Sequence, residues 1–467
     1  MRVREQWLQM INKFVGDKML SFANKDKEFV AGTYNRFPVE IVSGKGSYLY
    51  DINGKEYIDM GSGIGVTAFG IADDEWKEAV ISQINKVQHT SNLYYTEPCV
   101  ALAELLCKKT GFKKVFFGNS GAEANECAIK VARKWAADNK GDEYYKIVTL
   151  ENSFHGRTIT TLAATGQEHY HKMFNPLTDG FIHTPANDIK ALEKTVSSNK
   201  IAAVMIECVQ GEGGVIPLEN EFVEAIERLS KEKDFLIIVD EVQTGNGRTG
   251  KLYGYMNFDI MPDIVSTAKG LGGGLPIGAT LLGDRVQNVL GFGDHGSTYG
   301  GNPVCAAGAL NVINRIDDTL LAEVSKKSEY IFETLKNADG IESVSGMGLM
   351  IGIKTTKPAA EVVKAAMEKG VLCLTAKDKV RLLPALNIPF DEKTVSLSLV
   401  TGTGRITASL SLIFKSVLLF SQELIYMHLY PSTSRSLFNS SCLLSPPIIM
   451  MFFIVTSCKS DILHIMF

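Results

Sequence analysis

The sequence predicts an α/β protein that has a large domain with a mostly parallel sheet and a smaller α+β domain. Short, continuously apolar runs rich in β-branched residues, such as IAAVMI and FLIIV, alternate with helical patterns. Strands of this kind are buried on both faces of a parallel sheet, and the intervening helices cover those faces. The chain also has 467 residues, of which 45% are hydrophobic, so it is long enough for more than one core.

Residues 1–60 predict an N-terminal helix and a β-rich segment of the small domain. Residues 1–18 mix charged and apolar residues at helical spacing, which predicts a short amphipathic helix rather than a secretory signal. Residues 36–60 alternate apolar and polar positions and are interrupted by glycines and by the pair Asn53-Gly54. This pattern is typical of antiparallel hairpins.

Residues 61–310 predict the large domain. It opens with helical patterns at residues 75–87 and 100–109, and repeated pairs of strand and helix follow. Five strands end in polar or glycine-rich segments, namely GNSGAEAN, SFHGRT, ECVQGEGG, DEVQTGNGRTG and AKGLGGG. Because ligands bind at the carboxyl ends of the strands in such sheets, these segments predict one common site.

Residues 311–394 predict the C-terminal part of the small domain. Helical patterns at 303–316 and 320–337 precede short strands, and we expect the domain boundary in the helix after Asn302. Residues 395–467 differ in composition, since they are rich in Ser, Leu, Ile and Phe and poor in charge. Pro446-Pro447 interrupts their uncharged span, which disfavours a membrane-spanning helix. We interpret this segment as an atypical, aberrant tail.

Composition argues against several classes of partner. A formal net charge of −4 provides no broad basic surface, so we expect neither nucleic acid nor a membrane as a partner. Eight cysteines without a CxxC pair favour reduced thiols in a cytoplasmic protein. We expect no metal site, because no suitably spaced carboxylate or cysteine accompanies the histidines. We expect those histidines to be solvated loop residues: His155, His169, His171 and His295.

The segment GNSGAEANE predicts an anion pocket at the start of a helix. Ser120 is placed as the N-cap, and Glu123 is its capping-box partner three residues later. The backbone N–H groups of Gly121 and Ala122, together with the helix dipole, suit a phosphate. An ordinary helix cap without a ligand is the alternative. Nucleotide-binding loops are disfavoured, because the segment matches neither GxGxxG nor GxxxxGK[ST].

Asp240 and Lys269 complete a set of groups suited to pyridoxal 5′-phosphate. Asp240 ends an apolar strand, where a carboxylate needs a cationic or proton-donating partner. A magnesium ligand is one such use, but no P-loop accompanies it, and the protonated ring nitrogen of the cofactor fits better. Lys269 follows an apolar run and precedes glycines, so it can form a Schiff base and move protons. The alternative interpretation of Lys269 is a surface lysine in a glycine-rich loop.

From about Tyr34 to Asp391 the chain resembles the class III aminotransferases of fold type I, most closely those that act on N-acetylornithine. The resemblance rests on motifs in the same order: TYNRFPV, HTSNLYY, NSGAEANE, SFHGRT, ECVQGEGGV, DEVQTGNGRTG, AKGLGGGLPIGA and HGSTYGGNPV. It implies a cytoplasmic homodimer with shared active sites, with N-acetylornithine as amino donor and 2-oxoglutarate as acceptor. The products would be N-acetylglutamate 5-semialdehyde and glutamate, as in arginine biosynthesis.

The resemblance also implies a role for each residue of the cofactor site. Gly121 and Ala122 would bind the phosphate, and Thr298 of the neighbouring subunit would complete that site. Phe154 would stack on the ring, and Gln243 would contact its phenolic oxygen. The remaining residues of this implied cofactor set are Asp240, Glu241, Val242 and Lys269.

The resemblance also implies a set of substrate-binding residues. Arg157 would hold the carboxylate at the far end of the substrate, with a buried structural ion pair as its alternative role. Arg381 would bind the α-carboxylate of 2-oxoglutarate, and Glu212 would neutralise Arg381 when the amino donor is bound. Such a pair opens only for a substrate whose carboxylate can replace Glu212. Ser297 is expected to belong to the same substrate site.

Three alternatives to this function stay open on the sequence. The first is another class III aminotransferase, acting on ornithine, succinylornithine or 4-aminobutyrate, because these share the cofactor residues. The second is an aminomutase or racemase that uses the same cofactor. The third is a catalytically silent protein in which the altered C-terminus disturbs the region of Arg381 or the dimer.

Overall fold

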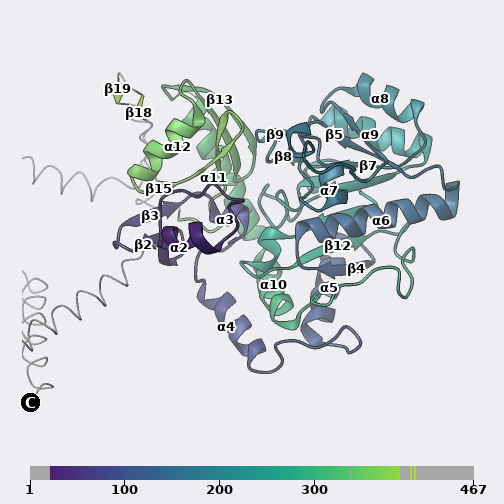
Figure 1. Cartoon of the computed structure of the whole chain (residues 1–467), viewed down its shortest axis with the longest axis horizontal. Helices are drawn as coiled ribbons and strands as arrows, with labels where there is room; N and C mark the ends of the chain where they lie inside the picture. The colour runs from purple at the N-terminus through teal and green to yellow at the C-terminus, as the bar shows by residue number, and fades with distance from the viewer. Residues whose placement is uncertain (1–21, 337, 390–399, 402–403, 406–467) are drawn as a thin grey trace, which may run out of the picture. The chain divides into compact units, whose positions relative to one another are not determined.

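The computed structural model describes residues 22–336, 338–389, 400–401 and 404–405 (Figure 1). By its contacts the chain divides into two compact units, and the described residues belong to the first, Met1–Asp391 with Ser396–Leu410. The helix expected within residues 1–18 lies outside the described residues. So does the tail expected over residues 395–467, apart from the hairpin of β18 (Val400–Thr401) and β19 (Gly404–Arg405). The expected domain boundaries stay predictions.

A seven-stranded sheet has the order β4-β12-β11-β10-β7-β5-β6. Figure 1 labels four of its strands, β4, β5, β7 and β12. Its pairings are parallel except those of β12, which is antiparallel to β11 and to β4. Two antiparallel pairings cancel, so β4 points the same way as the other five strands. The predicted α/β fold with a mostly parallel sheet is therefore confirmed. The strands are β4 (Lys114–Gly118), β5 (Lys146–Leu150), β6 (Phe181–Thr184), β7 (Ile201–Ile206), β10 (Leu236–Asp240), β11 (Ile264–Thr267) and β12 (Gly278–Leu282).

The main core lies between this sheet and α6 (Gly121–Lys140). Strands β7, β10, β11 and β12 are buried at every residue, as expected for continuous apolar runs. On α6, Ala128 and Ala132 lie one turn apart and are fully buried, so the helix backbone can lie close to the strands. The other helices of this part are α7 (Ile159–Ala164), α8 (Ile189–Ser198), α9 (Asn220–Lys233), η1 (Glu168–Tyr170), η2 (Gly254–Asn257) and η3 (Lys269–Gly272).

The four helices expected from periodicity are present within a few residues of their predicted bounds. The second pair begins at α10, whose first turn is capped by Asn302. The Oδ1 atom of Asn302 accepts hydrogen bonds from Val304 N at 3.0 Å and Cys305 N at 3.2 Å. None of the helices in the described chain has the length and apolar character needed to cross a membrane. The four are α4 (Asp74–Ile84), α5 (Glu97–Thr110), α10 (Pro303–Arg315) and α11 (Asp318–Lys336), and α2 (Phe22–Phe29) and α3 (Ser62–Gly65) precede them.

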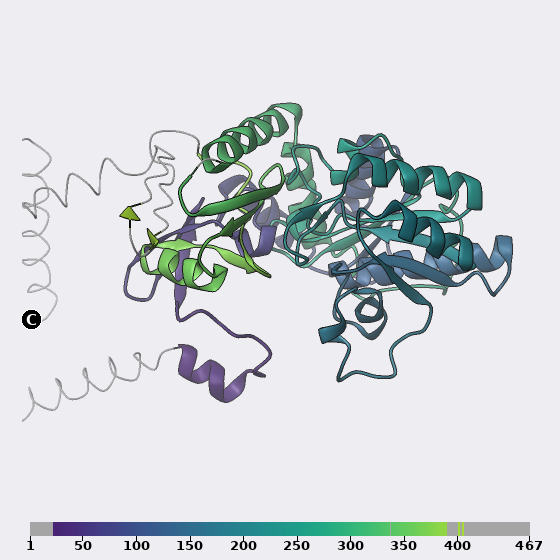
Figure 2. The same cartoon turned by 90° about the horizontal axis from the view of Figure 1, so that it is seen from above.

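The described chain has two further four-stranded sheets, and one of them combines early and late strands. The expected hairpins are present, because β1 pairs antiparallel with β2, and β2 with β3. Strand β15 joins this sheet parallel to β3 and so brings Val371 beside Ile58. The other sheet has the order β13-β14-β17-β16, and α12 (Ala359–Glu368) packs against β15, β16 and β17 (Figure 2). The strands are β1 (Ile41–Lys45), β2 (Tyr48–Asp51), β3 (Glu56–Asp59), β13 (Ile341–Met347), β14 (Met350–Thr355), β15 (Val371–Leu372), β16 (Leu374–Ala376) and β17 (Lys379–Leu382).

Candidate active site

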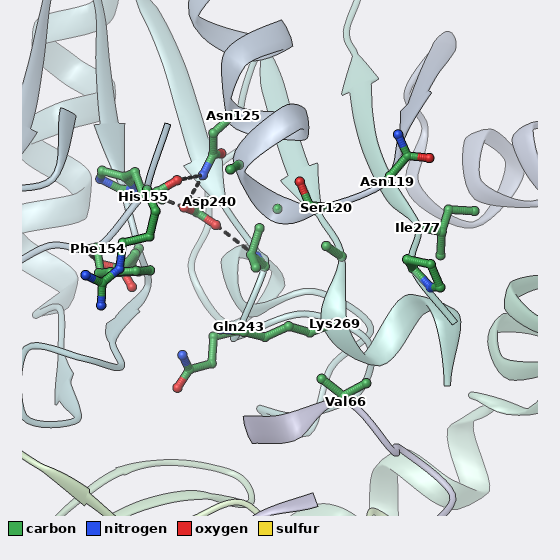
Figure 3. A pocket seen from close by; sticks show the side chains of 18 of the residues that line it. Val66, Asn119, Ser120, Asn125, Phe154, His155, Asp240, Gln243, Lys269 and Ile277 are labelled. Atoms are coloured by element: carbon green, nitrogen blue, oxygen red, sulfur yellow. Dashed lines mark hydrogen bonds and ion pairs between the residues drawn. The ribbon is translucent and has the colours of Figure 1, made fainter. Parts of the chain in front are cut away.

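The five strand ends singled out in the sequence line one pocket of about 460 Å³ (Figure 3). Because β4, β5, β7, β10 and β11 point the same way, their carboxyl ends meet at one edge of the sheet. The structure thus brings the five segments together, and the ligand site predicted for them stays a prediction. Its polar lining includes Asn119, Ser120, Asn125, His155, Arg157, Glu207, Asp240, Gln243 and Lys269.

The start of α6 forms one wall of the pocket. Ser120 is the N-cap, as predicted, and its Oγ accepts a hydrogen bond from Glu123 N at 3.2 Å. In a capping box the Glu123 carboxylate would accept a hydrogen bond from Ser120 N. Here it accepts from Asn119 N, one residue earlier, at 2.6 Å. The first-turn N–H groups of Gly121 and Ala122 have no acceptor within the helix and are available to an anion. A Cβ atom at Gly121 would lie 2.7 Å from Val242 Cγ1, so only glycine fits there.

Asp240 ends β10 and is held by a buried network that Figure 3 shows in part. Its Oδ2 lies 2.8 Å from His155 Nδ1 and also accepts a hydrogen bond from Asn125 Nδ2 at 2.8 Å. Its Oδ1 accepts from Val242 N at 2.9 Å. Asn125 is fixed in turn, because its Oδ1 accepts from Ser266 Oγ at 2.5 Å. The carboxylate is thus oriented by groups from two other segments and from its own, and Asp240 lines the pocket.

The expectation that His155 is a solvated loop residue is wrong. Only 2% of the residue is exposed, because the loop after β5 turns its ring under Asp240. Burial lowers the pKa of His155, but the hydrogen bond and the negative charge of Asp240 outweigh it and raise that pKa above its usual value. The contact with Asp240 therefore favours the protonated, charged form of His155.

The other histidines singled out in the sequence differ among themselves. His171 is half-buried, and its Nε2 lies 2.9 Å from Leu162 O and 2.8 Å from Thr165 O, so it too is not simply solvated. His295 is half-buried and His169 is exposed. Within the described part of the chain, no group of three His, Cys, Asp or Glu side chains is placed to hold a metal ion.

Lys269 follows the buried strand β11 and begins η3. Its backbone φ is +44°, in the left-handed region that non-glycine residues rarely adopt. Burial lowers the pKa of the Lys269 amine below its usual value, and Arg381 lowers it further, while Glu212, Asp240 and Glu207 act in the opposite direction. A lowered pKa increases the fraction of free amine, which is the nucleophilic form.

Phe154 and Arg157 lie on the loop that also carries His155, and both line the pocket. The Arg157 guanidinium carbon lies 5.4 Å from the ring centroid of Phe154 and 4.2 Å from that of Tyr170. Arg157 is exposed, and no carboxylate of the described residues lies within ion-pair distance of it. The alternative of a buried structural ion pair for Arg157 is therefore wrong.

Glu212 and Arg381 form an ion pair in which the arginine is buried and the glutamate is half-buried. Arg381 Nη1 on β17 lies 2.5 Å from Glu212 Oε1 in the loop between β8 (Val209–Gln210) and β9 (Ile216–Pro217), and Arg381 is 3% exposed. Burial raises the pKa of Glu212, but the charge and hydrogen bond of Arg381 lower it below its usual value, so the pair is ionised. Gln243 joins it, because its Oε1 accepts from Arg381 Nη1 at 3.1 Å and its Nε2 donates to Glu212 Oε1 at 3.3 Å. Gln243 links this pair to the pocket that it lines.

Five residues expected in the site do not line this pocket. Glu212 and Arg381 are two of them and contact it through Gln243. The other three are Glu241, Ser297 and Thr298. The Glu241 carboxylate points elsewhere, since it accepts from Gly254 N at 2.8 Å, Tyr255 N at 2.7 Å and Thr244 Oγ1 at 2.6 Å. Ser297 Oγ accepts from Asn119 Nδ2 at 3.0 Å, next to the pocket wall. Thr298 is exposed.

The structure adds Asn125, His155 and Glu207 to the pocket. Two of them carried a signal that sequence reasoning could have used. Asn125 lies four residues after Gly121 and therefore on the same face of α6. Glu207 directly follows β7, just as Asp240 ends β10. The loop that brings His155 under Asp240 has no such regular spacing.

Most of the chain is similar to proteins of one known family. The family model described as "Aminotransferase class-III" matches residues 29–398. The chain is 49% identical over 365 residues to the "Acetylornithine aminotransferase" of Haemophilus ducreyi, covering 78% of this chain and 93% of that one. It is 43% identical over 367 residues to that of Methanocaldococcus jannaschii, covering 77% and 92%.

Solved structures give a similar result. The ornithine aminotransferase from Toxoplasma gondii matches with a TM-score of 0.75 and 30% identity, covering 81% of this chain and 93% of that one. The N-acetylornithine aminotransferase from Stenotrophomonas maltophilia matches with a TM-score of 0.67 and 35% identity, covering 76% and 92%.

Proposed function

The chain belongs to the class III aminotransferases, which depend on pyridoxal 5′-phosphate, and we propose that it transfers the terminal amino group of N-acetylornithine to 2-oxoglutarate. The products are N-acetylglutamate 5-semialdehyde and glutamate, and the role is in arginine biosynthesis. Relatives between 40% and 49% identical that carry the name acetylornithine aminotransferase support this choice of donor.

The groups in the pocket fit the cofactor. The N–H groups of Gly121 and Ala122 would hold its phosphate, and the Asp240 carboxylate would pair with its protonated ring nitrogen. Phe154 and Val242 would hold its ring, and Gln243 would bind its phenolic oxygen. When bound, the cofactor supplies an aldehyde that receives the amino group and a ring that withdraws electrons. Lys269 provides the amine that anchors it and then moves the proton at the substrate carbon.

The observation that carries the substrate proposal is the Glu212–Arg381 ion pair. N-acetylornithine presents its reacting amine without an adjacent carboxylate, so the pair stays closed and masks the charge of Arg381. 2-Oxoglutarate has a carboxylate beside its keto group, which displaces Glu212 and takes its place on Arg381. Arg157 is exposed and free of carboxylates among the described residues, and it holds the far carboxylate of either substrate.

Glu212→Gln is expected to impair one half-reaction selectively. An unmasked Arg381 charge disfavours the donor chain, so kcat/KM for N-acetylornithine falls roughly 10- to 100-fold, the value of one charge-assisted hydrogen bond. The reaction with 2-oxoglutarate changes little, because its carboxylate still meets Arg381. Single-turnover absorbance of the cofactor measures each half-reaction separately. Arg381→Gln is the matched variant and is expected to give the opposite pattern. Equal losses in both half-reactions of Glu212→Gln would contradict the switch.

A panel of donors tests the function itself. With 2-oxoglutarate as acceptor, we expect the highest kcat/KM for N-acetylornithine among N-acetylornithine, succinylornithine, ornithine and 4-aminobutyrate. Ornithine is the second candidate, because ornithine aminotransferases from Toxoplasma gondii match with TM-scores of 0.75 and 0.77. Turnover of a donor without any 2-oxoglutarate would indicate an aminomutase or racemase instead.

We further propose a homodimer in which each subunit completes the other's site. Tyr95 is 98% exposed and Phe292 is fully exposed. Exposed large apolar side chains that lie close together are typical of an interface with another chain. Asn92 Nδ2 donates to Ser297 O and Gly300 O at 2.9 Å each, so the two exposed segments lie side by side. A second copy that covers them would bring Thr298 to the phosphate site of its partner.

Mixing two inactive variants tests this sharing. Thr298→Asp places a carboxylate against the phosphate of the neighbouring site, and Lys269→Ala removes the reactive amine of its own site. A dimer with one copy of each has one intact site. Random mixing is therefore expected to recover roughly a quarter of the native activity. Activity after co-expression with two different tags is the measurement. No recovery in the isolated mixed dimer would show that Thr298 serves its own subunit.

The thiols support a reducing compartment, and we propose the cytoplasm. The described cysteines are free, and several are buried in apolar surroundings where burial raises their pKa values. They are Cys99, Cys107, Cys127, Cys208, Cys305 and Cys373.

A further inference from the structure

Glu207 is a buried carboxyl group in the pocket wall to which the reaction described above gives no task. It follows β7 directly, and only 5% of the residue is exposed. Its Oε2 accepts a hydrogen bond from Phe154 N at 3.0 Å. Its other oxygen has no hydrogen-bond partner among the described residues, although Glu207 lines the pocket. Buried polar atoms usually have a hydrogen-bond partner. The surroundings of this oxygen therefore change when a ligand enters the pocket.

The single hydrogen bond of Glu207 acts on a loop that carries much of the site. This loop brings Phe154, His155 and Arg157 to the pocket. It has little regular structure of its own, since Asn152 has φ +67° and Gly156 has φ +143°. Glu207 therefore fixes the main chain at the residue that covers the cofactor ring.

The ionisable groups around Glu207 lie on three other segments and on its own. His155 follows β5, Asp240 ends β10 and Lys269 follows β11, and Cys208 is its neighbour in sequence. Burial and the negative charge of Asp240 raise the pKa of Glu207 to about 7, although His155 and Lys269 act to lower it. Glu207 therefore changes its charge close to neutral pH.

Ionised Glu207 conflicts with a bound cofactor in two ways. Asp240 already supplies the carboxylate that the ring nitrogen needs, so a second negative charge repels an anionic cofactor. The cofactor also displaces water from the unpartnered oxygen, and a desolvated carboxylate is more costly than a neutral carboxyl group.

We propose that Glu207 is a positioning residue that couples cofactor binding to pH: when neutral it holds Phe154 and admits the cofactor, and when ionised it weakens cofactor binding. The proposal rests on the cofactor chemistry of the family and not on the identity of the amino donor. A different donor in the panel above would leave it unchanged.

Binding of pyridoxamine 5′-phosphate to the apoenzyme tests the proposal, because this probe cannot condense with Lys269. Its dissociation constant is measured by fluorescence from about pH 6 to about pH 8.5, where the wild type is expected to lose roughly tenfold more affinity than Glu207→Gln, as for one pKa unit. The glutamine variant keeps an acceptor for Phe154 N and stays neutral. Titration of the probe itself is common to both proteins and cancels.

Glu207→Met separates position from charge. It removes the acceptor as well as the charge, so we expect weak binding at every pH with no extra dependence on pH. Should this variant fail to fold, the comparison of the wild type with Glu207→Gln still tests whether the charge of Glu207 controls the affinity for the probe. The proposal is overturned if Glu207→Gln loses affinity with pH as steeply as the wild type does.

Discussion

Lys269→Ala is expected to abolish turnover and to remove the visible absorbance band that reports covalent attachment of the cofactor. The variant loses both the nucleophilic amine and the group that moves the substrate proton, so kcat falls by at least about 10⁴-fold. The cofactor itself is retained more weakly, because the N–H groups at the start of α6 and Asp240 are unchanged. Absorbance spectra and steady-state kinetics on the purified variant measure both effects.

The geometry explains why no other amine can substitute for Lys269. It is the lysine that lines the described pocket, and the buried strand β11 together with its unusual φ fixes where its amine points. Burial also lowers the pKa of this amine below its usual value, which increases the share of free base at a given pH. A small primary amine added to the buffer is expected to restore part of the rate, since it supplies the missing base in the cavity left by the side chain.

Lys251→Ala is the matched control for Lys269→Ala. Lys251 is an exposed lysine in another glycine-rich stretch and does not line the pocket. Its loss is expected to leave both the absorbance band and kcat unchanged. If Lys269→Ala kept the band and came within tenfold of native activity, the role assigned to Lys269 would be wrong.

The position of Lys269 and Asp240 could be predicted because both depend on local patterns. Each follows a continuous apolar run, and the carboxyl ends of parallel strands meet at one edge of a sheet. Ser120 was predictable for the same kind of reason, since N-caps are set by the residues next to them. The sequence therefore indicated the pocket as soon as the strands were recognised.

The features that the sequence did not indicate depend on how loops fold back onto the sheet and on how the strands are connected. His155 lies in a loop without periodicity, so nothing local shows that its ring is buried under Asp240. Glu241 follows the same strand as Asp240, yet the Gly254 and Tyr255 N–H groups draw its carboxylate away from the pocket. Strand β12 is as apolar as its neighbours but runs antiparallel, because direction is set by the connections and not by the strand itself. The role proposed for Thr298 requires a second chain.

Asp240→Asn is expected to reduce kcat by at least about 10³-fold, the scale of losing a preorganised electrostatic contact where charge develops. A neutral amide cannot keep a proton on the cofactor's ring nitrogen, so the ring withdraws electrons poorly. Lys269 remains, and the variant is expected to keep a visible band whose dependence on pH is altered. Single-turnover kinetics and a pH titration of that band are the measurements.

Asp263→Asn is the matched control, because Asp263 is also a largely buried carboxylate of this sheet. It accepts a hydrogen bond from Ile237 N at 2.9 Å and pairs with Arg285, at the amino ends of β10 and β11 and away from the pocket. Its replacement is expected to lower stability and to leave kcat within a few-fold of native. A fall in kcat of less than tenfold in Asp240→Asn would show that the ring nitrogen does not depend on this carboxylate.

The hydrogen bonds of Asp240 make asparagine a poor replacement in either orientation. An amide nitrogen in the place of Oδ1 would face the Val242 N–H group, and in the place of Oδ2 it would face Asn125 Nδ2. Asn125 cannot turn to relieve the conflict, because its Nδ2 also donates to His155 O and its Oδ1 accepts from Ser266. His155 can adapt only by giving up its proton on Nδ1, and its protonated, charged form is lost with it. The same network that orients Asp240 for the cofactor thus ensures that a change of one atom disturbs the whole of it.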